Sequence, residues 1–452
     1  MARDEAQDYA TATARGLVAA LAQGRLSAAE LCETAIEHIE RLDPPIKAVV
    51  VRDFDRARET AKQADAALAR GERRPLLGLP MTVKEAHNVA GLPTTWGLES
   101  ARDFIPATDS VGVARLKAAG AVILGKTNVP PFLSDWQSAN PVYGRTNNPH
   151  DLTRSPGGSS GGSAAALATG MVPLEFGSDI GGSIRVPAGF CGVYGHKPSH
   201  GLVPQRGHAP PGLDGGDIVL GVVGPLARDP ADLELALDVL AGPDAMEATG
   251  YCLALPAPRH EALADYRVLM IDSHPLAKVE AEIRSALDGL ARRLEGAGGA
   301  VGRSSDKLPD LAAAHELYFR ILLTALSRAG PPGPDVMSAH AWMDALDGQL
   351  AIRRQWGRLF EDFDVVLAPV LGVVAFEHLT GEWAERSLTI DGEVTPFAAQ
   401  LAWPGMATLA NLPVTAVPIG VTRAGLPIGM QIIGPYLEDR TPLAFAKLLG
   451  GL

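Results

Sequence analysis

Two serine- and glycine-rich segments, residues 156–163 and 177–185, hold the candidate catalytic side chains. A serine hydroxyl attacks a carbonyl carbon only when a base removes its proton, and the oxyanion that forms needs fixed N–H donors. Ser159 and Ser183 each follow a pair of glycines, which let other groups approach the backbone closely. The consecutive N–H groups of residues 180–183 could form an oxyanion nest beside Ser183. The two segments therefore indicate hydrolysis by a serine nucleophile.

Lys84 is the candidate base. It ends the segment 78–84, which predicts a buried strand, and no histidine lies near either turn in the sequence. A lysine accepts a proton only when its pKa falls from about 10.4, and burial lowers the pKa of an amine by several units. A lysine at a strand end is more often exposed, and glycine-rich segments are often linkers. On the residues alone, both interpretations stay open.

Three other motifs match catalytic patterns but lack the context that those patterns need. Residues 120–127 match the phosphate-binding loop, yet the four inner residues, Ala, Val, Ile and Leu, favour a strand. Residues 157–161 match the nucleophile elbow, but the preceding segment 153–156 is a loop that ends in proline, where a strand should lead into the serine. Residues 304–307 match S-x-x-K in a polar stretch. We expect none of the three to be a site of that type.

Alternating apolar periodicities predict the elements that position these residues. Turns and loops are expected at 141–162, 177–183 and 330–334, with a surface connection around 243–262. Helices are expected within 9–43 (two), at 53–70, 109–119, 163–169, 278–296 and 309–328, and strands at 78–84, 121–124, 172–176, 268–271, 365–368, 414–419 and 429–433. The second helix should begin with a capping box, Ser27 and Glu30, and end at Asp43-Pro44-Pro45. This order predicts a layered α/β fold with much parallel sheet.

The composition is that of a globular protein: 46% of the 452 residues are hydrophobic and 20% are charged. A formal net charge of −12 argues against a nucleic-acid partner, which requires a basic surface. Three cysteines cannot form a disulfide framework and fit a reducing compartment. The polar start, residues 1–12, does not predict a signal peptide, and no run of about 18 apolar residues predicts a membrane span. We expect a cytoplasmic protein without a membrane partner.

Several segments together resemble the amidase-signature family. They are PGGSSGGSAAA at 156–166, GSDIGGSIR at 177–185, PAGFCGVYGHKP at 187–198 and GLPMTVK at 78–84. The spacing between Ser159 and Ser183 agrees with that family, as do GKTN at 125–128, NNP at 147–149 and GLPIGMQIIG at 425–434. The resemblance spans nearly the whole chain and is weakest at about 200–265 and 300–400. The combination of these segments is far more specific to the family than any single glycine-rich match.

The resemblance implies a Ser–Ser–Lys triad. Ser183 corresponds to the nucleophile, Ser159 to the bridging serine that follows a cis peptide bond from Gly158, and Lys84 to the terminal base. The oxyanion donors of the family correspond to the N–H groups of Ile180, Gly181, Gly182 and Ser183. The resemblance implies no metal ion and no cofactor, and the sequence contains no metal-spaced cluster of cysteine and histidine.

The resemblance also implies an α/β fold in one domain over residues 1–452, with a large twisted mixed β-sheet flanked by α-helices on both faces. We expect N-terminal helices at about 9–70 and a catalytic core at about 76–235. A smaller, more variable part should follow at about 245–400, and the C-terminal strands should return to the core.

Departures from the family concern the substrate. Glu85 stands where many members carry Asp, and residues 128–136 replace a more acidic, Met-rich version found in glutamine-using members. Leu133, Trp136 and Tyr143 are candidates for an apolar substrate pocket, with core packing as an equal alternative. Arg185 is a candidate substrate-binding residue, although a structural role is favoured.

The leading interpretation is an amidase that hydrolyses small uncharged amides through an acyl-enzyme, as a monomer or homodimer. The same chemistry would open anilides, esters and carbamates such as urethanes. The alternative is the glutaminase subunit of a tRNA-dependent amidotransferase, which would need a partner chain and an acid/base pair to hold free glutamine. An inactive binding module is a third class, against which the intact triad argues.

Overall fold

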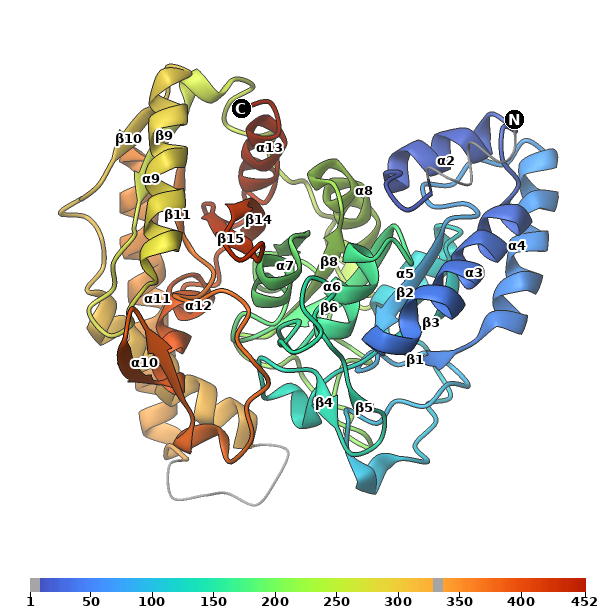
Figure 1. Ribbon diagram of the computed structural model, residues 1–452, viewed down its shortest axis with the longest axis horizontal. Coiled ribbons are helices and arrows are strands. Elements are labelled where there is room, and N and C mark those ends of the chain that lie inside the picture. The colour runs from blue at the N-terminus through green and yellow to red at the C-terminus, as the bar shows by residue number, and fades with distance from the viewer. Residues whose placement is uncertain (1–8, 328–335) are drawn as a thin grey trace.

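A mixed sheet of 11 strands forms the centre of the computed structural model, which describes residues 9–327 and 336–452 (Figure 1). The strand order is β1-β3-β2-β6-β8-β7-β14-β15-β11-β9-β10. The strands are β1 (Val49–Arg52), β2 (Pro80–Lys84), β3 (Val122–Thr127), β6 (Leu174–Asp179), β7 (Tyr194–Lys197), β8 (Val222–Ala227), β9 (Arg267–Met270), β10 (Ala300–Gly302), β11 (Val365–Pro369), β14 (Val414–Val421) and β15 (Pro427–Ile433).

Strand direction changes along this sheet. The neighbours β2–β3, β2–β6, β9–β10 and β9–β11 are parallel. The other adjacent pairs are antiparallel. Two short hairpins lie outside the sheet: β4 (Ala139–Asn140) with β5 (Gly144–Arg145), and β12 (Ser387–Ile390) with β13 (Glu393–Pro396). The C-terminal strands β14 and β15 are thus inserted between β7 and β11, in the middle of the sheet.

Helices pack on both faces of the sheet. They are α2 (Ala14–Ala22), α3 (Ala28–Ile46), α4 (Phe54–Ala69), α5 (Val111–Ala118), α6 (Gly161–Ala168), α7 (Arg185–Cys191), α8 (Pro230–Leu240), α9 (Ala281–Gly296), α10 (Leu311–Leu326), α11 (Ala339–Asp362), α12 (Ala402–Leu409) and α13 (Arg440–Leu449). In one layer, α6 packs against β2, β3 and β6, and α7 against β7, β14 and β15. In another, α8 and α13 pack against each other and against β7, β8, β14 and β15.

The helices α6 and α7 lie at the centre of the molecule, between the N-terminal helices α2–α4 at one end and α9–α11 at the other (Figure 1). Nearly every residue of α6 and every residue of α7 is buried. The small side chains of α6 allow this helix to approach the neighbouring backbone closely. A Cβ on Gly162, for example, would collide with the backbone of Asn128. Both serine-rich segments lead directly into these two helices, so the catalytic candidates are anchored in the core.

The predicted helices and strands are present, but several differ in extent, and other elements, such as β7, β8 and α11, were not predicted. The capping box of Ser27 and Glu30 is confirmed, but α3 continues through Pro44 and Pro45 to Ile46. Prolines are tolerated here because the missing hydrogen bonds fall in the last turn, and Lys47 then ends the helix in a left-handed conformation. The strand β3 extends to Thr127, and β6 extends to Asp179 into the predicted turn. Residues 161 and 162, predicted as loop, begin α6.

The phosphate-loop match at 120–127 is a strand, as predicted. Residues 122–127 form β3, which pairs with β1 on one side and β2 on the other, so its N–H groups bond within the sheet. Residues 304–307 are a loop, also as predicted. The predicted loop at 330–334 and the first eight residues of the predicted polar start lie outside the described residues. None of the helices in the described ranges combines the length and apolar character that a bilayer crossing requires.

Candidate active site

Two neighbouring strands bring the first site residues together. The strands β2 and β6 are parallel and adjacent, with Val83 opposite Phe176, so their carboxyl ends lie at the same edge of the sheet. Lys84 ends β2, and Ser178 and Asp179 end β6. Because both strands are buried along their whole length, the side chains that leave this edge enter the protein interior.

Lys84 lies at the centre of a hydroxyl cluster. Its Nζ donates to Ser159 Oγ over 2.6 Å and to Ser178 Oγ over 2.9 Å. The lysine side chain is fully buried. Burial lowers the pKa of Lys84 to about 7, although the carboxylates of Asp179 and Glu175 favour the charged form. Lys84 can therefore exist as a neutral amine near neutral pH, which is the form that accepts a proton.

Ser159 follows a cis peptide bond from Gly158. A Cβ on Gly158 would collide with the carbonyl oxygen of Asp135, so only glycine fits there. The next residue connects the two serine-rich segments, because Ser160 N–H donates to the carbonyl oxygen of Ser183 over 3.1 Å. This backbone contact fixes the segment that carries Ser159 against the turn that carries Ser183.

The turn after β6 is organised around one buried ion pair. Asp179 accepts from the N–H groups of Gly182 (2.9 Å) and Ile184 (3.0 Å), and from Arg185 Nε (3.0 Å) and Nη2 (2.8 Å). Burial raises the pKa of the Asp179 carboxyl, but the Arg185 guanidinium and the backbone donors outweigh it and hold that pKa well below its usual range. Asp179 is thus a permanent acceptor that shapes the turn.

The side chain of Arg185 is held by protein groups and is not part of the cavity wall. Its guanidinium is fully buried and also donates to Pro404 O, Gln431 Oε1 and Thr408 Oγ1. With the two bonds to Asp179, all five donors are used. Arg185 therefore joins the catalytic turn to α12 and β15.

The predicted oxyanion donors divide into two groups. The Gly182 N–H is occupied by the Asp179 carboxylate. Ile180, Gly181 and Ser183 line the same cavity as Ser159 and Ser178. Within the described residues, the N–H groups of Gly181 and Ser183 donate to no protein acceptor. Ile180, Gly181 and Ser183 therefore remain the candidate oxyanion donors.

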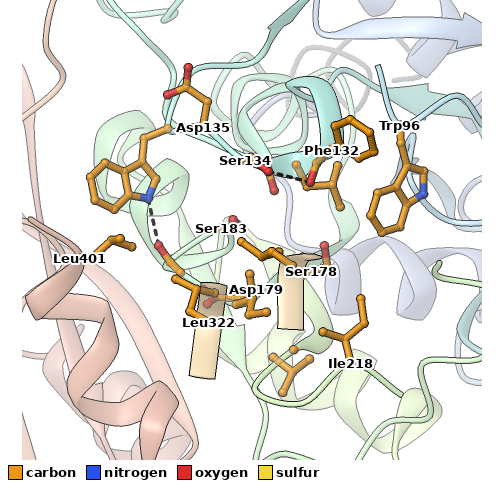
Figure 2. A pocket seen from close by; sticks show the side chains of 18 of the residues that line it. Trp96, Phe132, Ser134, Asp135, Ser178, Asp179, Ser183, Ile218, Leu322 and Leu401 are labelled. Atoms are coloured by element: carbon orange, nitrogen blue, oxygen red, sulfur yellow. Dashed lines mark hydrogen bonds between the residues drawn. The ribbon is translucent and has the colours of Figure 1, made fainter. Parts of the chain in front are cut away.

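A cavity of about 290 Å³ opens over Ser183. Figure 2 shows Ser183 and Ser178 among the apolar side chains of its wall. That wall includes Trp96, Leu133, Trp136, Ile218, Phe319, Leu322, Leu323, Leu326, Trp383 and Leu401. A second cavity, of about 400 Å³, shares Trp96, Phe132, Ser134, Ile218 and Leu326 with the first. The site is a largely apolar pocket with a cluster of hydroxyls at one position.

Two of the three predicted pocket residues, Leu133 and Trp136, line this cavity. Tyr143 is not part of that cavity wall, and its hydroxyl donates to Glu85 Oε1 over 3.1 Å. The contribution of α10, which supplies Phe319, Leu322, Leu323 and Leu326, was not predicted. The apolar pattern of these residues predicted the helix, but it did not indicate which face of the helix lines the site.

His208 is a second feature that the sequence did not reveal. It lines the cavity, and neither of its ring nitrogens has a hydrogen-bond partner within residues 9–327 and 336–452. Burial, together with the charge of Lys84, lowers the pKa of His208 to about 3. The ring is therefore neutral at physiological pH and adds no charge to the pocket. Across the same described ranges, no group of three or more His, Cys, Asp or Glu side chains is placed to hold a metal ion.

Comparisons with known proteins agree along nearly the whole chain. A family model described as Amidase matches residues 30–331 and 333–443. One subunit of the glutamyl-tRNA(Gln) amidotransferase of Roseiflexus castenholzii is 34% identical over 94% of this chain and 92% of its own. AtzE, which is one subunit of the 1-carboxybiuret hydrolase of Pseudomonas sp. (strain ADP), is 33% identical over 96% of this chain and 97% of its own. A crystal structure of a bacterial aryl acylamidase of the amidase-signature family has a TM-score of 0.79 at 26% identity, covering 97% of this chain and 96% of that one.

Removing the buried carboxylate should destabilise the protein strongly. Asp179→Asn leaves the Arg185 guanidinium buried without its counter-charge, and we expect a loss of about 3–5 kcal/mol in the free energy of unfolding. Asp244→Asn is the matched control, because Asp244 makes a two-bond pair with the exposed Arg206, and we expect a loss below about 1 kcal/mol. Urea denaturation of both variants measures the difference. Equal losses would contradict the structural role given to Asp179.

Proposed function

The chain belongs to the amidase-signature family, and on that premise we propose that it is a serine amidase acting on small uncharged amides with apolar substituents. The observation that carries the proposal is the contact of a buried amine with a hydroxyl: Lys84 Nζ lies 2.6 Å from Ser159 Oγ, in the cavity that Ser183 lines. A buried lysine whose pKa is about 7 is suited to accept and return a proton.

The proposed reaction uses the hydroxyl cluster as a proton path. Neutral Lys84 takes the proton of Ser159, which takes the proton of Ser183 as Ser183 Oγ attacks the carbonyl carbon. The negative charge that develops on the carbonyl oxygen is stabilised by N–H groups of the 180–183 turn. The proton returns along the same path to the leaving nitrogen, and the C–N bond breaks. Water then attacks the acyl-enzyme and releases the acid.

Ser178 has a supporting role in this scheme. Its Oγ accepts from Lys84 Nζ over 2.9 Å, and its carbonyl oxygen lies 3.4 Å from the same nitrogen. These two acceptors fix the direction of the amine toward Ser159. The lysine thus keeps one defined orientation while it gains and loses a proton.

The pocket favours neutral substrates. Its two carboxylates are already paired, Asp135 with Arg386 over 2.6 Å and Asp179 with Arg185 over 2.8 Å. Free glutamine carries a charged amino group and a charged carboxylate, and both would lose water in this largely apolar pocket. Asp135 Oδ1 has no hydrogen-bond partner among the described residues and could meet the amino group, but the cavity wall that these residues form holds no lysine or arginine for the carboxylate. This disfavours the glutaminase alternative, although relatives at 33–34% identity include subunits of larger enzymes.

A substrate panel tests the proposal. We expect the purified chain to hydrolyse neutral anilides or alkyl amides, with esters and carbamates of similar shape as further substrates. Free glutamine should give a kcat/KM at least about a hundredfold lower, because about 3 kcal/mol of unpaired-charge desolvation corresponds to that factor. Ammonia release and aniline absorbance measure the two reactions. Preference for glutamine would overturn the substrate assignment, and no labelling of Ser183 by a fluorophosphonate would favour an inactive binding module.

The triad assignment predicts the effect of three variants. Ser183→Ala and Lys84→Ala should each lower kcat by several orders of magnitude, because they remove the nucleophile and the base. Lys117→Ala, on the half-buried lysine that pairs with Asp109, should leave kcat unchanged. The assay uses the best neutral amide of the panel, with protein folding checked by circular dichroism. A Lys84→Ala enzyme of near-normal activity would rule out the base assignment.

The pH dependence of kcat/KM follows from the lowered pKa of Lys84. The amine is protonated and inactive below a pH of about 7, and it is neutral and able to act as base above it. We therefore expect kcat/KM to fall about tenfold per pH unit well below 7 and to level off above it. A pH–rate profile from pH 5 to 9 measures this limb. A kcat/KM that still rises tenfold per pH unit up to pH 9, without levelling off, would mean that Lys84 keeps an ordinary pKa.

A further inference from the structure

The orientation of the proposed oxyanion donors is set by three carbonyl contacts from outside the turn. A trans peptide unit is planar, and its C=O and N–H point in opposite directions. Whatever holds the carbonyl oxygen of Ile180 therefore directs the N–H of Gly181, and the same relation joins Gly181 to Gly182 and Gly182 to Ser183.

Each of these carbonyls has one donor. Tyr318 Oη donates to the carbonyl oxygen of Ile180 over 2.9 Å. Trp136 Nε1 donates to that of Gly181 over 2.9 Å. Val186 N–H, in the first turn of α7, donates to that of Gly182 over 2.7 Å. The first two donors are side chains from distant parts of the sequence, and neither is part of the triad.

The N–H ends of the same peptide units have different environments. The unit held by Trp136 is fixed at both ends, because its Gly182 N–H donates to Asp179. The unit held by Tyr318 is fixed at its carbonyl end alone, which leaves Gly181 N–H directed away from Tyr318. Since Gly181 lines the cavity and its N–H meets no acceptor among the described residues, this group is available to an oxyanion.

Tyr318 and Trp136 are suited to this task because each keeps a proton to donate. The indole N–H has no acceptor capacity. Burial raises the pKa of Tyr318, so its phenol keeps the proton at every physiological pH. The Tyr318 ring is fully buried and packs so tightly that a Cβ on Gly405 would lie 2.7 Å from its Cδ1. Tyr318 is not part of the cavity wall, so it reaches a substrate only through Ile180 and Gly181.

We propose that Tyr318 is a positioning residue that aims the Gly181 N–H at the oxyanion by holding the carbonyl oxygen of Ile180, while Trp136 fixes the neighbouring peptide unit of the turn. The inference rests on the proposed serine amidase function and assigns its oxyanion stabilisation to a hydroxyl on α10. Losing an oxyanion donor itself typically lowers kcat by about 10²–10³. Losing its orientation should have a smaller effect, because the N–H remains present.

The test compares catalysis with the binding of a transition-state analogue. With a trifluoromethyl ketone, Ser183 Oγ adds to the carbonyl carbon and the carbonyl oxygen becomes an oxyanion. The proton of Ser183 passes to Lys84. Tyr318→Phe removes one oxygen atom and leaves the ring. We expect kcat on a neutral amide to fall about tenfold to a hundredfold with KM changed less than about threefold. The inhibition constant of the ketone should rise by the same factor as kcat/KM falls, and the acidic limb near pH 7 should stay in place.

Tyr9→Phe is the matched control. Tyr9 is also buried, and its hydroxyl donates to the carbonyl oxygen of Met171 over 3.0 Å, at a place remote from the turn. This variant should change neither kcat per active site nor the ketone inhibition constant. Trp136→Phe is the second variant: we expect it to weaken ketone binding as well, with an added change in KM because Trp136 lines the cavity.

All rates are expressed per active site titrated with a fluorophosphonate, so partial unfolding lowers the titre and leaves the inhibition constant unchanged. A Tyr318→Phe enzyme with normal ketone affinity and normal kcat per titrated site would overturn the inference. If the unmodified enzyme hydrolyses no amide and Ser183 is not labelled, the proposed function fails instead. The two failures are therefore distinguishable.

Discussion

The candidate site depends on one buried amine, Lys84, whose pKa is lowered by burial. Lys84 is fully buried, and within the described part of the chain its Nζ bonds to hydroxyl oxygens and a carbonyl and to no carboxylate. A carboxylate in direct contact would stabilise the ammonium form and remove the base. The nearby acids are kept from that role in different ways: Asp179 is paired with Arg185, and burial raises the pKa of Glu175 to about 7. Hydroxyl partners allow the amine to be neutral and still be fixed in direction.

The Asp179–Arg185 ion pair organises the turn that carries the proposed nucleophile. The carboxylate organises Gly182, Ile184 and Arg185, and the guanidinium extends the same network to α12 and β15. Ser183 and Gly181, whose N–H meets no acceptor among the described residues, line the same cavity as Asp179. A buried ion pair adds little stability compared with apolar packing, but it defines one geometry because every donor must be satisfied. The ion pair thus fixes the turn, and its two residues lie a few positions along the chain from the proposed nucleophile.

The sequence predicted those parts of the fold and the site that depend on local rules. Periodicity predicted many of the helices and strands but not β7, β8 or α11, and paired glycines correctly marked where backbones meet, as at Gly158 against Asp135. Other features of the site depend on direction in space, which the sequence does not give. Arg185 points into the core, and the hydroxyl of Tyr143 points toward Glu85. Spacing along a chain does not tell which side of a turn a side chain leaves, and the joining of α10 to this turn is a long-range contact without a local signal.

The helix α10 contributes both to the wall of the cavity and to the hydrogen bonds that hold the turn. Tyr318, Leu322 and Leu326 are spaced four residues apart, so they lie along one face of the helix. The first holds the Ile180 carbonyl, and the other two line the cavity. A change that moves this helix to enlarge the pocket would also move the hydroxyl that fixes the turn. Substitutions that reshape the leucines without shifting the helix axis avoid this coupling. We therefore infer that the pocket of this enzyme is more readily altered by side-chain exchange along α10 than by rearrangement of its backbone.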